Sequence, residues 1–115
     1  MSDSPAKLVY VVKFVADMDQ AVGFYRDTLG LTLKFQSPDW SEFATGDTIL
    51  ALHLASASKA PGTARIGLSV PDLQAFYAEM SARGVTFTMP PTIEGGFRLA
   101  LFLDSEGSEV GVSEA

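Results

Sequence analysis

The sequence contains no cysteine, one histidine (His53) and one tryptophan (Trp40). The absence of cysteine excludes disulfide bonds, thiolate metal ligands and thiol nucleophiles. No apolar run approaches the roughly 20 residues that cross a bilayer, and the first residues lack the apolar core of a secretory signal. We therefore expect a soluble, cytoplasmic protein.

Basic residues are also few, because eight Lys and Arg stand against fourteen Asp and Glu, for a net charge of −6. They are scattered along the chain, whereas binding to phosphate backbones needs clustered positive charge. Neither nucleic acid nor a membrane is expected as a partner. The acidic surface either favours cationic ligands or only keeps a small protein in solution, and the second is the more frequent case.

Two segments of the chain have the pattern of a capped amphipathic helix. In DMDQAVGFYRDTLGLTLKF, residues 17–35, Asp17 is the expected N-cap, Gln20 completes a capping box, and Gly30 ends the helix. Apolar residues recur between them at helical spacing. The device is repeated about 54 residues later, with Asp72 as the cap and Gly84 at the end.

Strands are predicted where β-branched and aromatic residues gather between turn signals. The first half is expected to contain strands at 7–15, 31–36, 40–45 and 48–55, and the second half at 65–70, 85–88, 97–103 and 108–113. Residues 89–96 are predicted to be a loop, a lid or a plain connector, because prolines cannot join a central ladder.

The two halves match one another, since FVADMDQA aligns with LSVPDLQA when one residue is deleted. The chain is therefore predicted to be a single domain, 1–115, of class α+β. It would contain two tandem β-α-β-β-β modules, 7–55 and 64–113, with a linker at 56–63. Each module is too small to bury its sheet alone. We expect them to form a cup-shaped mixed sheet with the helices on the outside.

The segments VADMDQAVGFYRDTLGLTLKF, IGLSVPDL and FLDSEGSEVGV resemble signatures of the vicinal oxygen chelate superfamily. This superfamily contains glyoxalases, extradiol dioxygenases, fosfomycin-modifying enzymes and bleomycin resistance proteins. The resemblance covers nearly the whole chain. It implies the cup-shaped fold and a homodimer, but it says little about function because members differ in the chemistry of the site.

Metal-dependent members present four ligands, one from the inner face of each of four strands. By resemblance, those positions are held here by Tyr10, Ala51, Arg65 and Gly111. Tyrosine is a rare ligand, arginine cannot deprotonate, and alanine and glycine carry no donor atom. His53 supplies only one nitrogen. We therefore expect no metal, no other cofactor and no assigned catalytic residue.

Small residues at 51, 67 and 111 would leave either a pocket or a core that larger neighbours fill. The candidate ligand-binding residues are Tyr10, Trp40, His53, Arg65 and Arg98. His53 is expected to be a hydrogen-bonded wall residue. Arg65 needs a partner, which would be an acidic neighbour such as Glu109 or Glu42, or an anionic group of a ligand.

Three functions are compatible with this pattern. The first is a metal-free protein that sequesters a small, planar or antibiotic-like molecule, similar to bleomycin resistance proteins. The second is a glyoxalase- or dioxygenase-type lyase or oxidoreductase that works through an atypical site. The third is a structural or regulatory module that has lost its ligand.

Overall fold

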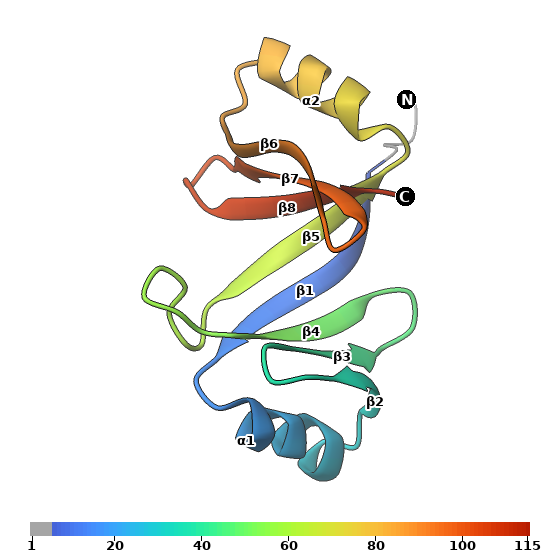
Figure 1. Ribbon diagram of the computed structural model, residues 1–115, viewed down its shortest axis with the longest axis vertical. Helices are drawn as coiled ribbons and strands as arrows, with labels where there is room; N and C mark the ends of the chain where they lie inside the picture. Colours follow the sequence, from blue (N-terminus) through green and yellow to red (C-terminus); the bar gives the residue numbers. More distant parts are fainter. Residues whose placement is uncertain (1–5) are drawn as a thin grey trace. The chain divides into compact units, whose positions relative to one another are not determined.

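A computed structural model describes residues 6–115 and divides the chain into two compact units (Figure 1). The first unit is Val9–Ala64, and the second is Arg65–Ala115 together with the start of the chain up to Leu8. Each unit contains one helical segment and four strands, and the eight strands belong to one mixed sheet. The predicted α+β class and the repeated β-α-β-β-β order are therefore confirmed.

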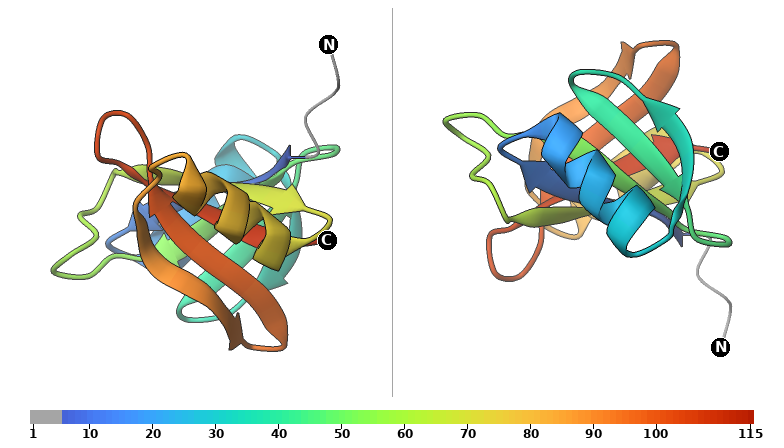
Figure 2. Two further views of the ribbon diagram at one scale, coloured as in Figure 1. Left: turned by 90° about the horizontal axis from the view of Figure 1, so that it is seen from above. Right: turned by 90° about the horizontal axis from the view of Figure 1, so that it is seen from below.

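The first unit consists of β1 (Lys7–Val15), α1 (Met18–Gly23), η1 (Phe24–Thr28), β2 (Thr32–Gln36), β3 (Trp40–Ala44) and β4 (Ile49–Leu54). Its strands lie in the order β2-β3-β4-β1. The neighbours β4 and β1 are parallel, whereas the pairs β2–β3 and β3–β4 are antiparallel. The α1 helix crosses one face of these strands (Figure 2).

The helix of the first unit begins as predicted and then changes its winding. The Asp17 carboxylate accepts a hydrogen bond from the Gln20 amide at 3.0 Å, so Asp17 is the N-cap. The α-helical turns end at Gly23, and a π-helical segment follows in which the Leu29 amide donates to the Phe24 carbonyl at 3.0 Å. Gly30, with φ of 77°, then reverses the chain toward β2, as its position predicts.

Alternate residues of the first unit's strands face two different environments. The face toward α1 packs five buried side chains together, namely Val15, Met18, Val22, Phe43 and Leu52. The opposite face carries a second buried group, Val12, Phe14 and Ala51, with Tyr10 and Trp40 packed against it. Both parities of β1 are therefore apolar because both of its faces are covered.

The second unit consists of β5 (Ala64–Val70), α2 (Leu73–Ala82), β6 (Phe87–Glu94), β7 (Phe97–Leu103) and β8 (Glu109–Glu114). Its strands lie in the order β5-β8-β7-β6, with β5 and β8 parallel. The Asp72 carboxylate caps α2 by accepting from the Ala75 amide at 3.0 Å. The core beneath α2 is formed by Val70, Leu73, Ala100 and Val112.

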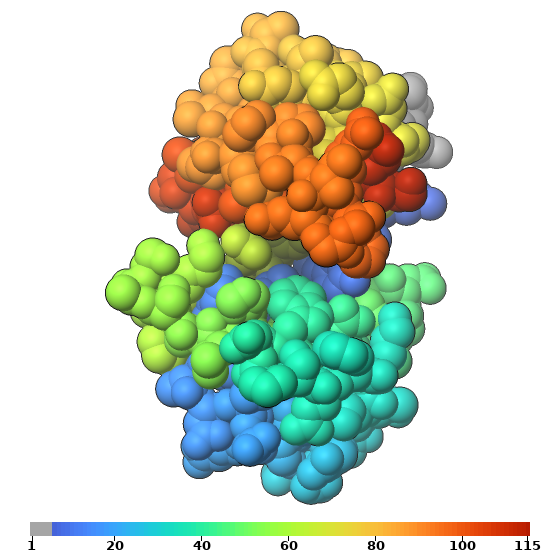
Figure 3. Space-filling model, in the orientation of Figure 1, coloured from blue at the N-terminus to red at the C-terminus, as the bar shows by residue number. Residues whose placement is uncertain are grey.

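The predicted loop at 89–96 is wrong, because most of it belongs to β6, which pairs with β7 through Glu94. In the second unit β6 is the last strand in the order, where proline removes no hydrogen bond from a central ladder. Its pairing shifts twice along its length. The hairpin of β6 and β7 (orange) lies at the surface of its unit in Figure 3.

The segment predicted as a linker, 56–63, is attached to β1 in the first unit. The Gly62 amide donates to the Phe14 carbonyl at 2.8 Å, and the Phe14 amide donates to the Thr63 carbonyl at 2.9 Å. The Lys13 ammonium donates to the Gly62 carbonyl at 2.7 Å. Within residues 6–115, no helix is long and apolar enough to span a membrane.

Candidate ligand-binding site

Three of the predicted site residues lie together on the face of the first unit that α1 does not cover. The register places Phe14, His53 and Trp40 side by side on β1, β4 and β3. One rung along, Val12, Ala51 and Glu42 occupy the same face. Side chains that share a rung of neighbouring strands point to the same side of the sheet. The pairing therefore gathers the aromatic residues around the small Ala51.

The rings on this face contact one another mainly edge to face. The ring centroids of Tyr10 and Trp40 are 6.1 Å apart with an interplanar angle of 63°. Trp40 and His53 are 5.8 Å apart at 89°, and Phe14 and His53 are 5.3 Å apart at 53°. We call Tyr10, Phe14, Trp40 and His53 the aromatic cluster. Such arrangements match the quadrupoles of the rings, so each contact is favourable.

Glu42, which was not among the predicted site residues, places a negative charge beside the aromatic cluster. The Glu42 carboxylate accepts a hydrogen bond from Trp40 Nε1 at 2.8 Å. Its other oxygen lies 3.8 Å from the ammonium of Lys34. Burial raises the pKa of the Tyr10 hydroxyl, and the negative charge of Glu42 and a hydrogen bond to it raise that pKa further. Glu42 therefore orients two of the predicted ligand-binding side chains.

Trp40 is also fixed through its backbone by the turn between β2 and β3. The Ser37 hydroxyl donates to the Trp40 carbonyl at 2.6 Å and accepts from the Trp40 amide at 3.0 Å. The Ser37 amide donates to the same carbonyl at 2.9 Å. The indole is thus held at both ends, by the turn and by Glu42.

His53 lies on this face, and its ring is hydrogen-bonded to the backbone of β4. Its Nδ1 lies 2.8 Å from the Leu54 carbonyl oxygen, which can only accept. In the neutral ring the proton therefore lies on Nδ1, and Nε2 carries the lone pair. No nucleophile or acid is hydrogen-bonded to Nε2 among the described residues, so the ring is not part of a triad.

The second unit contains the other two predicted residues, Arg65 on β5 and Arg98 near the start of β7. Arg65 donates from a terminal guanidinium nitrogen to the Glu109 carboxylate at 3.1 Å, and the side chains are 19% and 27% exposed. The Thr88 hydroxyl donates to the other Glu109 oxygen at 2.9 Å. Of the two acidic neighbours considered, Glu109 is the one that pairs with Arg65. Arg98 is exposed and pairs with Ile93 beside the hairpin turn.

The four positions at which the resemblance implies metal ligands do not fit a divalent cation. The Tyr10 hydroxyl is hydrogen-bonded to Glu42, and Arg65 is a cation paired with Glu109. Ala51 and Gly111 have no side-chain donor. Among residues 6–115, no group of three or more His, Asp or Glu side chains is arranged to hold a metal.

Packing does not require a glycine at position 111. A Cβ atom built there would lie 3.7 Å from the Leu101 side chain and 3.8 Å from the Ile66 carbonyl, which are ordinary contacts. Glycine in the interior of a strand weakens that strand. An alanine at position 111 should therefore fit on β8 without displacing Leu101.

Comparisons with known proteins identify the fold family. Residues 7–112 match the Glyoxalase/Bleomycin resistance protein/Dioxygenase superfamily. The uncharacterized protein YurT of Bacillus subtilis (strain 168) is 28% identical over 123 residues, which cover 92% of this chain and 97% of YurT.

Solved structures of the same architecture have lower sequence identity. Methylmalonyl-CoA epimerase from Mycobacterium tuberculosis is 21% identical with a TM-score of 0.84, covering 99% of this chain and 91% of the epimerase. The hypothetical protein BH1468 from Bacillus halodurans C-125 is 17% identical with a TM-score of 0.79, covering 97% and 96% of the two chains. At these identities the likeness shows a shared fold alone.

Proposed function

The chain belongs to the glyoxalase/bleomycin resistance protein/dioxygenase superfamily, and we propose that it binds a small planar molecule on the aromatic cluster without a metal. The observation that carries this proposal is the aromatic cluster, in which the Glu42 carboxylate binds Trp40 and Tyr10. Binding on this face would sequester the molecule, as expected for a member of the bleomycin resistance type.

The chemistry of the face restricts the ligand. Trp40 and Tyr10 present edges and half-exposed ring faces, which favour a flat, apolar body. The Glu42 carboxylate can only accept hydrogen bonds, so it favours a ligand that carries an N–H or O–H donor or a positive charge. A planar aromatic molecule with a donor at its edge meets both conditions.

Tryptophan fluorescence tests this proposal directly because Trp40 is the only tryptophan. The protein is titrated with a panel of aromatic metabolites and aromatic antibiotics, including bleomycin, while emission and melting temperature are followed. A ligand at a hundred times its Kd adds about 2.7 kcal/mol to the free energy of unfolding. That corresponds to a melting-temperature increase of roughly 10 °C for a domain of this size.

A matched pair of variants tests the role of the carboxylate. Glu42→Gln should weaken the binding of a ligand that raises the melting temperature by about tenfold, since it removes a charged acceptor. Glu79→Gln, an exposed glutamate on α2, should leave affinity unchanged. If no member of a broad panel alters Trp40 emission or the melting temperature, binding at this face is refuted and a structural or regulatory role is favoured.

Whether the bound compound is chemically converted distinguishes an enzyme from a binding protein. Chemical conversion of a bound compound, lost on substitution of His53, would favour a lyase or oxidoreductase with an atypical site. Tightly bound stoichiometric metal, with activity lost on chelation, would refute the metal-free proposal. We also propose that the protein is a cytoplasmic homodimer. Light scattering of the purified protein measures its oligomeric state.

A further inference from the structure

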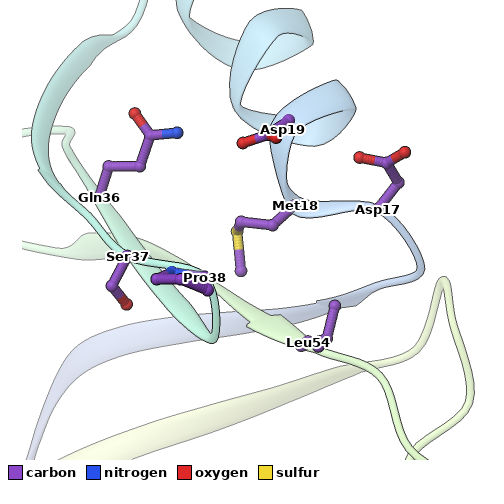
Figure 4. A pocket seen from close by; sticks show the side chains of 7 residues that line it. All are labelled: Asp17, Met18, Asp19, Gln36, Ser37, Pro38 and Leu54. Carbon is purple, nitrogen blue, oxygen red and sulfur yellow. The ribbon is translucent and has the colours of Figure 1, made fainter.

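A hollow of about 430 Å³ lies on the helix side of the first unit, apart from the aromatic cluster (Figure 4). It is formed by three segments that are distant in sequence: the start of α1, the turn between β2 and β3, and the end of β4. The residues that line it are Asp17, Met18, Asp19, Gln36, Ser37, Pro38 and Leu54. Its volume falls in the range of small-molecule sites.

The lining separates an apolar floor from a polar rim. Met18 is 6% exposed, and its sulfur accepts a hydrogen bond from the buried Ser41 hydroxyl at 3.3 Å, which fixes the floor. Leu54 and Pro38 complete the apolar part. In Figure 4 the Asp19 carboxylate and the Gln36 amide are turned toward one another across the Met18 side chain.

The rim carries negative charge and no positive charge. Asp17 and Asp19 both line the hollow, and none of the lining residues is basic. One Asp17 oxygen is used to cap α1, whereas Asp19 forms no ion pair within residues 6–115. The Asp17 carboxylate accepts from the Gln20 amide, and the two carboxylates repel an anion at this rim.

We propose that this hollow binds a small organic cation, namely a protonated amine with a compact apolar body. The apolar part would cover Met18, Pro38 and Leu54, and the ammonium would lie against the Asp19 carboxylate. This site is independent of the proposed binding on the aromatic cluster. It lies on the opposite side of the first unit's strands and uses none of the same side chains.

The hollow and the aromatic cluster share one structural element, the turn between β2 and β3. Ser37 lines the hollow and also holds the backbone of Trp40 by hydrogen bonds of 2.6 and 3.0 Å. An amine in the hollow therefore contacts the turn that positions the indole. Binding should change Trp40 emission slightly without displacing a ligand from the aromatic cluster.

The test uses the full chain labelled with ¹⁵N and titrated with cyclohexylmethylamine, an aliphatic amine that cannot stack on the aromatic cluster. Cyclohexylmethanol serves as the neutral probe of the same shape. The amine should shift the amide signals of Asp19, Gln36, Ser37 and Leu54 in a saturable manner. The alcohol should bind about three- to tenfold more weakly, the range expected when a half-exposed charge interaction is lost.

Two pairs of exposed substitutions locate the cation. Asp19→Asn should weaken amine binding about three- to tenfold, whereas Asp47→Asn changes the net charge equally at a distant turn and should have no effect. Gln36→Lys should abolish binding, whereas Gln74→Lys on α2 should not. Unfolding curves of all four variants confirm that each is folded before titration.

Three results would overturn the proposal. These are equal affinity for the amine and the alcohol, equal effects of Asp19→Asn and Asp47→Asn, or shifts confined to residues outside the lining. A Trp40→Phe variant that keeps amine binding separates this site from the aromatic cluster. Loss of amine binding in that variant would show that the hollow is not an independent site.

Discussion

Replacing Glu42 with glutamine tests whether one carboxylate organises the aromatic cluster. In the folded chain, Glu42 accepts from Trp40 Nε1 at 2.8 Å, accepts from the Tyr10 hydroxyl, and lies 3.8 Å from the Lys34 ammonium. Its side chain is only 16% exposed. A glutamine has one acceptor oxygen, and its NH₂ group would face either Trp40 Nε1 or the Tyr10 hydroxyl, both of which donate to Glu42. One of the two ring partners is therefore left without an acceptor.

The expected loss can be worked out from these contacts. A hydrogen bond to a charged group contributes about 1.5–3 kcal/mol, and partial exposure places Glu42 at the low end of that range. The pair with Lys34 adds little, since the lysine side chain is 57% exposed and such pairs contribute about 0–1 kcal/mol. Glu42→Gln should therefore lower stability by about 1.5–2 kcal/mol, or roughly 6–12 °C in melting temperature.

Thermal and urea unfolding, followed by circular dichroism, measure this loss, and two variants act as controls. Lys34→Met removes only the weak ion pair and should cost about 0.5 kcal/mol or less. Glu79→Gln removes an exposed helical pair with Arg83 and should also cost about 0.5 kcal/mol or less. Emission from Trp40 should change only in Glu42→Gln. A double-mutant cycle with Trp40→Phe should give a coupling of about 1 kcal/mol.

Equal melting temperatures for Glu42→Gln and Glu79→Gln would refute the reasoning, because half-burial and two ring partners would then have no energetic consequence. A coupling near zero between Glu42 and Trp40 would refute the specific contact. In that case the rings would be held by packing alone, and the carboxylate would have no assigned role in binding a ligand.

Two further predictions concern titration and the second unit. Tyr10 has a folded-state pKa above its unfolded value of about 10, so it contributes stability below that pH that is lost as pH rises through the folded pKa. Urea midpoints of Tyr10→Phe should consequently decline less steeply above about pH 10 than those of the unaltered protein, and parallel slopes would contradict this. Arg65→Met should cost about 1–2 kcal/mol, since it leaves the Glu109 carboxylate half-buried beside Thr88, against about 0.5 kcal/mol or less for Arg83→Met. If Arg65→Met weakens ligand binding as well as stability, Arg65 is more than a structural partner of Glu109.

Sequence patterns predicted the elements whose signals are local. β1 and β7 have the predicted bounds, 7–15 and 97–103, because continuous β-branched and aromatic runs end at turn residues. Asp17 and Asp72 cap their helices as predicted, since a cap depends on residues within one turn. The strand register was not predicted, and it is the pairing in the structure that places Tyr10, Trp40 and His53 on one face.

Features that depend on neighbouring strands were not predicted. The prolines of β6 are compatible with a strand only because β6 is last in its unit's strand order, which the local sequence does not specify. The π-helical segment is a change of hydrogen-bond spacing within a run that keeps helical periodicity. Glu42 could have been found from alternation, since it lies two residues after Trp40 and therefore on the same face.

Two of the four positions at which the resemblance implies metal ligands carry polar side chains, Tyr10 and Arg65. Each of these side chains interacts with a glutamate of its own unit. Tyr10 is hydrogen-bonded to Glu42, and Arg65 is paired with Glu109. Each unit therefore supplies a negative charge to the polar side chain at its position. These positions therefore act as parts of polar networks, and ligand binding should depend on the glutamates as much as on Tyr10 and Arg65.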